Sequence, residues 1–318
     1  MPKLRFAFFV LLPLVLIVGC KPGGIPATGL TNPDGKTALA DARKGFVTKL
    51  VKRQKANEPA PEPPANLFRK VQYDAPVGKC AAYLTPDPKD GKKRPAIIWI
   101  TGGDCSTIGD VWEPSPASND QTARQYRDAG LVMMFPSLRG GNQNPGVQEN
   151  FLGEVDDVLA AAEHLAKLDY VDPAHIYLGG HSTGGTLVML VAAVPNPFRA
   201  VFSFGPAEDI SGYPAQFRGA VNMSDPREVE LRSPGRWLHS VSVPTFVFEG
   251  TDGNLDSLQA MARASTNSKL KFFPIKGATH FSVLAPVNKR IAQKIAADTG
   301  AETNLTFTEA ELNGLFGR

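Results

Sequence analysis

A serine between glycines lies where an apolar run meets a helix-prone segment. Residues 180–184 read Gly-His-Ser-Thr-Gly, directly after the apolar run 174–179 and before the helix-prone run 187–193. A strand that turns sharply into a helix holds one hydroxyl clear of the sheet, and flanking glycines let the two backbones approach closely. The pattern therefore predicts that Ser182 is a nucleophile and that room for the turn comes from Gly180, Gly184 and Gly185.

Two downstream residues are candidates for the proton relay that a serine nucleophile requires. The serine needs a base to accept its proton and an acid to orient that base. In folds that place the serine on a sharp strand-to-helix turn, the acid and then the histidine follow it along the chain. His280 follows the last apolar run and is predicted to be the base. Asp252 follows the preceding apolar run and is predicted to be the acid, with Glu249 and Asp256 as alternatives. Together these residues predict nucleophilic acyl transfer.

Backbone N–H groups are expected to stabilise the negative charge that develops on a substrate carbonyl oxygen. The N–H of Thr183, the residue after the nucleophile, is one expected donor. The second is expected in the glycine-rich turn after the first long apolar run, at Gly103 or Asp104. Alternatively, this glycine pair only ends a strand.

The spacing of the remaining histidines does not predict a metal site. His164 lies in a helical run, His175 begins a strand, His239 lies in a polar stretch, and His181 is expected to pack beneath the nucleophile. No pair has the spacing of zinc ligands. We therefore expect neither a metal nor a cofactor.

The N-terminus has the pattern of an export signal. Residues 1–19 have a basic opening with Lys3 and Arg5, followed by an apolar stretch that is short for a membrane span. The sequence Ile-Val-Gly-Cys that ends at Cys20 resembles the lipobox of bacterial lipoproteins, which implies acylation of Cys20 and a lipid-anchored location in the bacterial cell envelope, facing the periplasm or the exterior. An ordinary signal peptide and an uncleaved anchor are the alternatives.

Composition limits the other function classes. The chain has 318 residues and a formal charge of +3, of which Lys3 and Arg5 contribute two, and no block of like charges suggests nucleic-acid binding. Cys80 and Cys105 remain as an even pair in an oxidising compartment, where a disulfide between them is one expectation and two buried thiols the other. Oligomeric state is left open.

The chain is divided by composition into five parts. Residues 1–19 are the signal, 20–36 a Gly- and Pro-containing tether, 37–56 a basic helical segment, 57–66 a Pro-rich linker and 67–318 the catalytic domain. The helical segment is expected to be solvated, to dock on the domain or to contact lipid head groups.

Alternating apolar runs and helical runs predict an α/β fold. Two runs around a turn predict an antiparallel hairpin, and later runs buried on both faces predict parallel strands. The expected strands are 68–73, 79–84, 96–100, 131–135, 174–179, 200–204, 245–249 and 270–274; the expected helices are 120–129, 153–167, 187–193, 255–264 and 283–297. This order predicts a mostly parallel, doubly wound sheet preceded by a hairpin, with catalytic groups beyond the carboxyl ends of its strands.

These motifs together resemble the α/β-hydrolase superfamily, within it the prolyl-oligopeptidase and dienelactone-hydrolase-like groups. Besides the serine motif, the resemblance rests on residues 136–141, 153–157, 170–173, 232–234 and 243–245. It implies an α/β-hydrolase fold with scaffold roles for Arg139, Asp156 and Asp157. Thr-Gly-Gly at 101–103 departs from the family's frequent His-Gly-Gly.

The resemblance implies a serine hydrolase whose partner is an acyl substrate, either a small molecule or a peptide. Ester hydrolysis through an acyl-enzyme on Ser182 is the first expectation, because the chain has no room for the propeller of prolyl oligopeptidases. A peptidase and a non-catalytic binding module are the alternatives. The stretch 205–240 is long enough for a small cap, with Tyr213, Phe217 and Trp237 either lining an acyl pocket or packing against the sheet.

Overall fold

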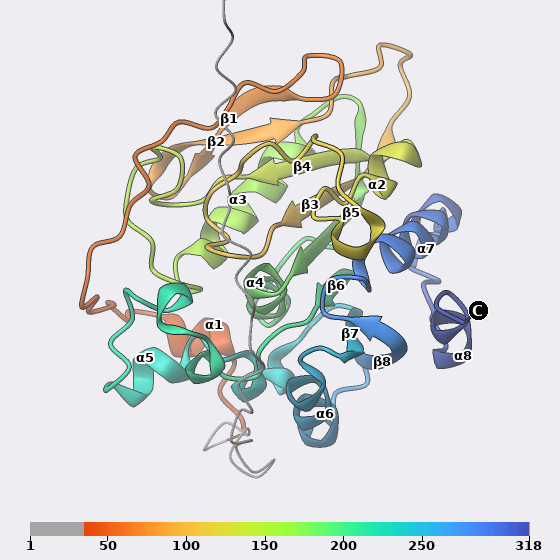
Figure 1. The fold of residues 1–318 in the computed structure, drawn as a ribbon. Coiled ribbons are helices and arrows are strands. Elements are labelled where there is room, and N and C mark those ends of the chain that lie inside the picture. The colour runs from red at the N-terminus through yellow and green to blue at the C-terminus, as the bar shows by residue number, and fades with distance from the viewer. Residues whose placement is uncertain (1–34, 318) are drawn as a thin grey trace, which may run out of the picture.

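The computed structural model describes residues 35–317, which are built around an eight-stranded sheet (Figure 1). The strand order is β1-β2-β4-β3-β5-β6-β7-β8; β1, β2 and β4 pair antiparallel, and all later neighbours pair parallel. The strands are β1 (Arg69–Ala75), β2 (Gly78–Leu84), β3 (Arg94–Ile100), β4 (Val132–Pro136), β5 (Val171–His181), β6 (Val201–Phe204), β7 (Thr245–Asp252) and β8 (Leu270–Thr279). The predicted hairpin and mostly parallel sheet are confirmed.

Helices cover both faces of this sheet (Figure 1). The α-helices are α1 (Leu39–Arg43), α2 (Gln125–Asp128), α3 (Glu154–Ala166), α4 (Thr183–Ala192), α5 (Pro226–Glu230), α6 (Leu255–Ala264), α7 (Leu284–Ala297) and α8 (Glu309–Asn313). Short 3₁₀ helices are η2 (Ala117–Asn119), η3 (Ile210–Gly212), η4 (Ala215–Phe217), η5 (Pro234–Arg236) and η6 (Leu238–Ser240). The predicted helix at 120–129 is shorter than expected, and the one at 255–264 has the expected bounds.

Alternate side chains of each central strand enter two separate cores, as the pleat requires. On β3, Ile98 and Ile100 pack with residues of α3, α4 and α6. Ile97 and Trp99 point the other way and pack with residues of α2, α7 and α8. This burial on both faces explains why β3 reads as an unbroken apolar run, and it fixes the carboxyl ends of the strands as a rigid rim.

The 205–240 stretch packs on the domain rather than standing open over the rim. Trp237 is fully buried, and its Nε1 donates to the carbonyl of Glu230. The Tyr213 hydroxyl lies 2.7 Å from the Thr186 hydroxyl on α4, and both residues are buried. Of the two expectations for these aromatic residues, packing is the one observed for Tyr213 and Trp237.

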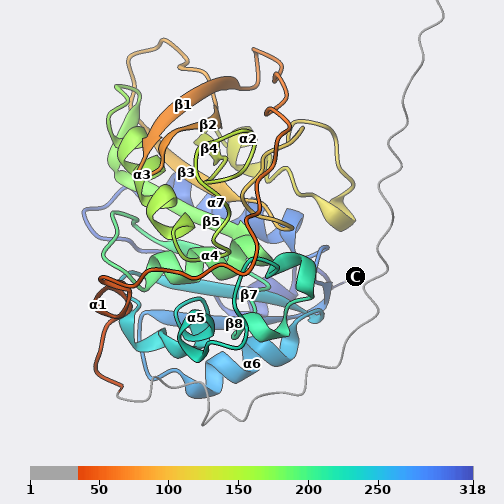
Figure 2. The same ribbon diagram turned by 90° about the vertical axis from the view of Figure 1, so that its left-hand side faces the viewer.

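The predicted helix at 37–56 is wrong beyond Arg43. Only α1 is helical, and residues 44–57, which we call the strap, run across the face that Figure 2 turns toward the viewer before the chain reaches β1, with a turn at residues 44–45 and a bend at 51–52. Backbone hydrogen bonds hold the strap in this shape, joining Val51 to Ala220, Ala56 to Gly140 and Gln54 to Gln148. Pairing with these loops outweighs the helix propensity of the segment.

The Pro-rich segment after the strap also lies against the domain. The Tyr83 hydroxyl donates to the carbonyl of Pro61, and the Lys70 ammonium donates to that of Ala60. The predicted signal 1–19, Cys20 and nearly all of the tether lie outside the described residues. Among residues 35–317 no helix combines the length and the apolar character that a bilayer crossing needs.

Candidate active site

Ser182 lies at the predicted sharp turn between β5 and α4. Its backbone has φ 57° and ψ −116°, a strained conformation typical of a nucleophile elbow. The turn is tight because a Cβ at Gly184 would lie 2.3 Å from the Ile100 carbonyl oxygen, and one at Gly185 would lie 2.4 Å from that of Phe204. The backbone N–H of Ser182 donates to the same Phe204 carbonyl at 2.7 Å. These close approaches leave no space for a side chain at Gly184 or Gly185, as the sequence pattern predicted.

The histidine is oriented by Glu249, which corrects the prediction of Asp252. His280 Nδ1 lies 2.9 Å from Glu249 Oε2, and the Glu249 side chain is fully buried. The backbone N–H of Gly250 donates to the other oxygen, Oε1, at 2.7 Å. Asp252 ends β7 beyond a register shift and is exposed, so its carboxylate faces solvent. A carboxylate accepts only, so Nδ1 is the protonated nitrogen and Nε2 is left as a base.

Two glycines make room for the Glu249 carboxylate. A Cβ at Gly205 would lie 2.4 Å from Glu249 Oε2 and 2.6 Å from His280 Nδ1. A Cβ at Gly253 would lie 2.3 Å from Glu249 Oε1. Gly205 directly follows the carbonyl that accepts from Ser182, so the serine turn and the histidine–glutamate pair meet at this glycine. Sequence reasoning missed the roles of both glycines.

The residues expected to donate to the oxyanion lie close together, on the first turn of α4 and in the loop after β3. Thr183 begins α4, and its hydroxyl donates to the Gly103 carbonyl at 2.9 Å, which ties the loop after β3 to the turn. Gly103 has φ +87°, a left-handed conformation that glycine adopts without strain. The Asp104 carboxylate is used within its own loop, where it accepts from the backbone of Ser106 and Thr107. Gly102 lies beside Ser182, since its Cβ would be 3.3 Å from Ser182 Cβ.

His181 packs next to His280, as expected for a structural residue. Its Nε2 donates to the His280 carbonyl at 3.0 Å, and the two rings have centroids 4.5 Å apart. Burial, with a smaller contribution from the charge of His280, holds the pKa of His181 well below its ordinary value. A neutral His181 fixes the backbone at His280 and thereby the direction of its ring. His175 pairs with Asp172 and His239 with the Thr37 carbonyl.

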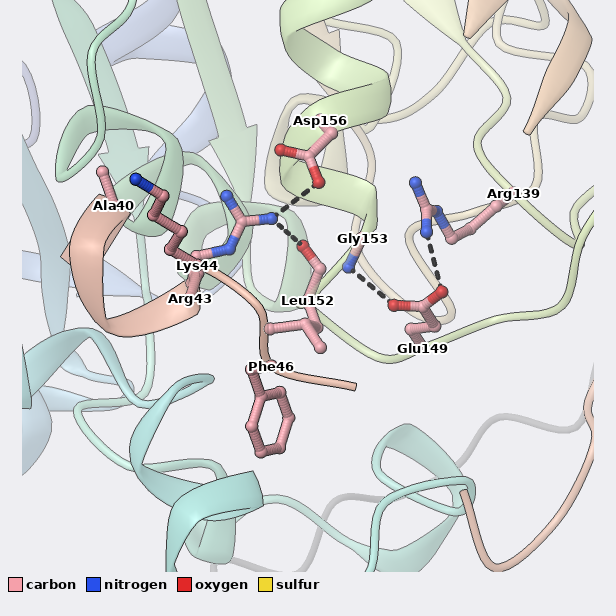
Figure 3. A pocket seen from close by; sticks show the side chains of 9 residues that line it. All are labelled: Ala40, Arg43, Lys44, Phe46, Arg139, Glu149, Leu152, Gly153 and Asp156. Atoms are coloured by element: carbon pink, nitrogen blue, oxygen red, sulfur yellow. Dashed lines mark hydrogen bonds and ion pairs between the residues drawn. The ribbon is translucent and has the colours of Figure 1, made fainter. Parts of the chain in front are cut away.

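Arg139, Asp156 and Asp157, predicted as scaffold residues, organise the start of α3. Arg139 binds both oxygens of the buried Asp157 and one oxygen of Glu149. A Cβ at Gly153 would overlap this guanidinium, which explains the glycine there. Asp156 accepts from Arg43 of α1 at 2.8 Å (Figure 3). A surface hollow of about 440 Å³ lies beside these residues. Its lining residues do not include Ser182, His280 or Glu249.

Cys80 and Cys105 are free thiols, so the expected disulfide is absent between these two described residues. Both side chains are buried. Cys80 contacts Tyr73 across the hairpin, and burial raises the pKa of its thiol to about 12. A thiol with so high a pKa is a poor nucleophile, so Cys80 acts as a small apolar core residue.

Comparison with known proteins agrees with this geometry. Residues 118–265 match the prolyl oligopeptidase family, a stretch that includes Ser182 and Glu249 and ends before His280. The dual function macrocyclase-peptidase POPB of Galerina marginata is 31% identical over 126 residues, which are 35% of this chain. The match spans only 17% of the Galerina protein.

Solved structures show the same fold. A puromycin hydrolase superposes with a TM-score of 0.59 at 15% identity, over 75% of this chain and 40% of its own. A hyperthermophilic esterase from Pyrobaculum calidifontis superposes with a TM-score of 0.54 at 18% identity, over 74% of this chain and 87% of its own. The chain therefore spans less than half of the puromycin hydrolase and most of the esterase, and its fold is that of the α/β-hydrolases.

Proposed function

Because this chain contains a prolyl oligopeptidase family domain with an α/β-hydrolase fold, we propose that it is a serine hydrolase that cleaves esters through an acyl-enzyme on Ser182. The observation that carries the proposal is the part-buried His280 held by the fully buried Glu249 beside a strained serine turn. The Pyrobaculum esterase supports ester cleavage, since this chain covers nearly all of that structure's length.

The proposed mechanism assigns one role to each group. His280 Nε2 accepts the Ser182 hydroxyl proton as the serine oxygen attacks the substrate carbonyl carbon. Glu249 stabilises the imidazolium that results, through the Nδ1 hydrogen bond. The backbone N–H of Thr183 and one donor from Gly103 or Asp104 stabilise the tetrahedral oxyanion. His280 then protonates the leaving alcohol, and water repeats the sequence to release the acid. Among the described residues the Ser182 hydroxyl makes no hydrogen bond, so proton transfer requires this hydroxyl and His280 Nε2 to come within hydrogen-bond distance.

Peptide cleavage is the second candidate, and the family match favours it. The prolyl oligopeptidase family and the Galerina macrocyclase-peptidase both indicate amide chemistry. The same acyl-enzyme forms from an amide, with His280 protonating a leaving amine in place of an alcohol.

Turnover of matched esters and amides tests these proposals. We expect the purified protein to hydrolyse short p-nitrophenyl esters faster than the corresponding aminoacyl p-nitroanilides, and a fluorophosphonate probe to label Ser182. Ser182→Ala is expected to abolish both labelling and turnover, because the nucleophile is lost. Faster cleavage of the anilides would replace the esterase by the peptidase. Folded protein that neither reacts with the probe nor turns over any member of the panel would indicate a binding module.

We also propose that the protein is exported and anchored to a bacterial envelope membrane by a lipid on Cys20. The basic and apolar pattern of residues 1–19 before this cysteine supports it. Metabolic labelling with a radioactive fatty acid tests it: the label should enter the protein and be absent from a Cys20→Ala variant. Equal labelling of the variant would contradict the proposal.

A further inference from the structure

The strap has one face on the domain and one face in solvent. Between Phe46 and Leu50 it is extended, so successive side chains point to opposite sides, and a bend at residues 51–52 leaves residues 51–53 exposed together. Phe46, Thr48, Leu50 and Gln54 are partly buried, whereas the intervening side chains are exposed. The Thr48 hydroxyl accepts from Arg232 and donates to Glu228, both of which are buried. These contacts hold the strap in one orientation, so the composition of its outer face is fixed.

The outer face carries unpaired positive charge. Its exposed cations are Lys44, Lys49, Lys52, Arg53 and Lys55. Among residues 35–317 none of these five side chains has an ion pair, unlike Arg43, which binds Asp156 and the Leu152 carbonyl in the corner seen in Figure 3. No acidic residue occurs between Asp41 and Glu58. The face therefore presents a row of uncompensated cations.

Two large apolar side chains lie among these cations. Val47 is 79% exposed and Val51 is 65% exposed, whereas the next most exposed large apolar residue among residues 35–317 is Leu315, at 38%. Exposed valines next to lysines are unfavourable in water. At a lipid surface the same arrangement is favourable, because apolar side chains enter the interface while cations contact anionic head groups.

We propose that the outer face of the strap binds an anionic lipid surface. Lysine and arginine near such a surface are attracted to it, and the attraction falls off within a Debye length. Nucleic acid would also attract the cations, but its phosphate backbone offers no apolar layer for two exposed valines to enter. The strap follows residues 1–34, so the lipid anchor proposed above would hold it near a membrane, although the inference itself rests on the charge and apolar exposure of the strap.

Hydrogen exchange on the full chain tests the proposal. The protein is mixed with vesicles of phosphatidylcholine, or of phosphatidylcholine with phosphatidylglycerol, and exchange of the peptide covering residues 44–55 is followed. An N-terminal anchor would act in both kinds of vesicle, so the difference between them isolates the strap. We expect exchange several-fold slower on the anionic vesicles, with the difference lost at about 1 M salt, where the Debye length is roughly 3 Å.

Charge reversal provides a matched comparison. Lys52→Glu/Arg53→Glu/Lys55→Glu is expected to remove the protection on anionic vesicles. Lys93→Glu/Lys271→Glu/Lys276→Glu changes the net charge equally at exposed sites away from the strap and is expected to keep it. Ester turnover and the melting temperature check that both variants are folded. Equal exchange on the two vesicle types, loss of protection in both variants, or equal protection of the strap by dextran sulfate in solution would overturn the proposal.

Discussion

Glu249→Gln is expected to lower kcat for a cleaved ester by about 10⁴-fold, the size of effect seen when the acid of a serine triad becomes an amide. The amide cannot stabilise the imidazolium, and its NH₂ group favours the wrong tautomer of His280 at the 2.9 Å contact. Steady-state kinetics on the purified variant measures the effect. KM should change little, because Glu249 is fully buried and acts through His280.

Asp252→Asn is the matched control for that substitution. Asp252 lies three residues further along β7 and is exposed, so its exchange should leave kcat within a few-fold of the wild-type value. The melting temperatures of both variants show whether either loses its fold. If Asp252→Asn were the inactive variant and Glu249→Gln the active one, the assignment of Glu249 would be wrong and Asp252 would be the acid.

The fold could be predicted largely because its strands are long apolar runs separated by helical patterns. The run at 96–100 became the strand β3, whose alternate residues are buried in two cores. The segment 37–56 could not be predicted in the same way. Its helix propensity is real but weak, and its observed shape depends on hydrogen bonds to loops more than eighty residues away, such as Val51 to Ala220.

The site could be predicted where local sequence determines it. The turn at Ser182 is specified by its own neighbours, because Gly184 and Gly185 lie against carbonyls of β3 and β6. The acid could not be chosen locally, because Glu249, Asp252 and Asp256 all lie near the end of one strand. The register shift between Gly250 and Asp252, set by pairing with β8, decides which carboxylate meets His280. The signal available in the sequence was weak: Glu249 directly ends an apolar run, where a buried carboxylate needs a partner.

Of the two expectations for Cys80 and Cys105, two buried thiols are observed, and the sequence could not decide between them for a related reason. An even number of cysteines limits the possible pairings but says nothing about where the side chains point. Cys80 lies on β2 opposite Tyr73, and its thiol is surrounded by core residues. The packing of the two side chains therefore decides that they stay free thiols, and the number of cysteines gives no information about this packing.

Gly253→Ala is expected to reduce kcat by roughly 10²-fold, the cost typical of misplacing a catalytic group by about 1 Å. Alanine would place its Cβ 2.3 Å from Glu249 Oε1, and the side chain of Glu249, being the movable partner, would shift away from His280. Backbone strain is not the cause, because Gly253 is not among the residues with positive φ. Kinetics on the same ester, with the melting temperature as a check on folding, measures the effect.

Two comparisons separate this steric effect from a general loss of stability. Gly212→Ala adds the same methyl group where nothing lies within 4 Å and should keep full activity. When Glu249 is already replaced by glutamine, Gly253→Ala should lower kcat very little further, because residues that act as one unit have non-additive effects. Independent losses that multiply in the double variant would contradict this account, since Gly253 would then act on something other than the Glu249 carboxylate.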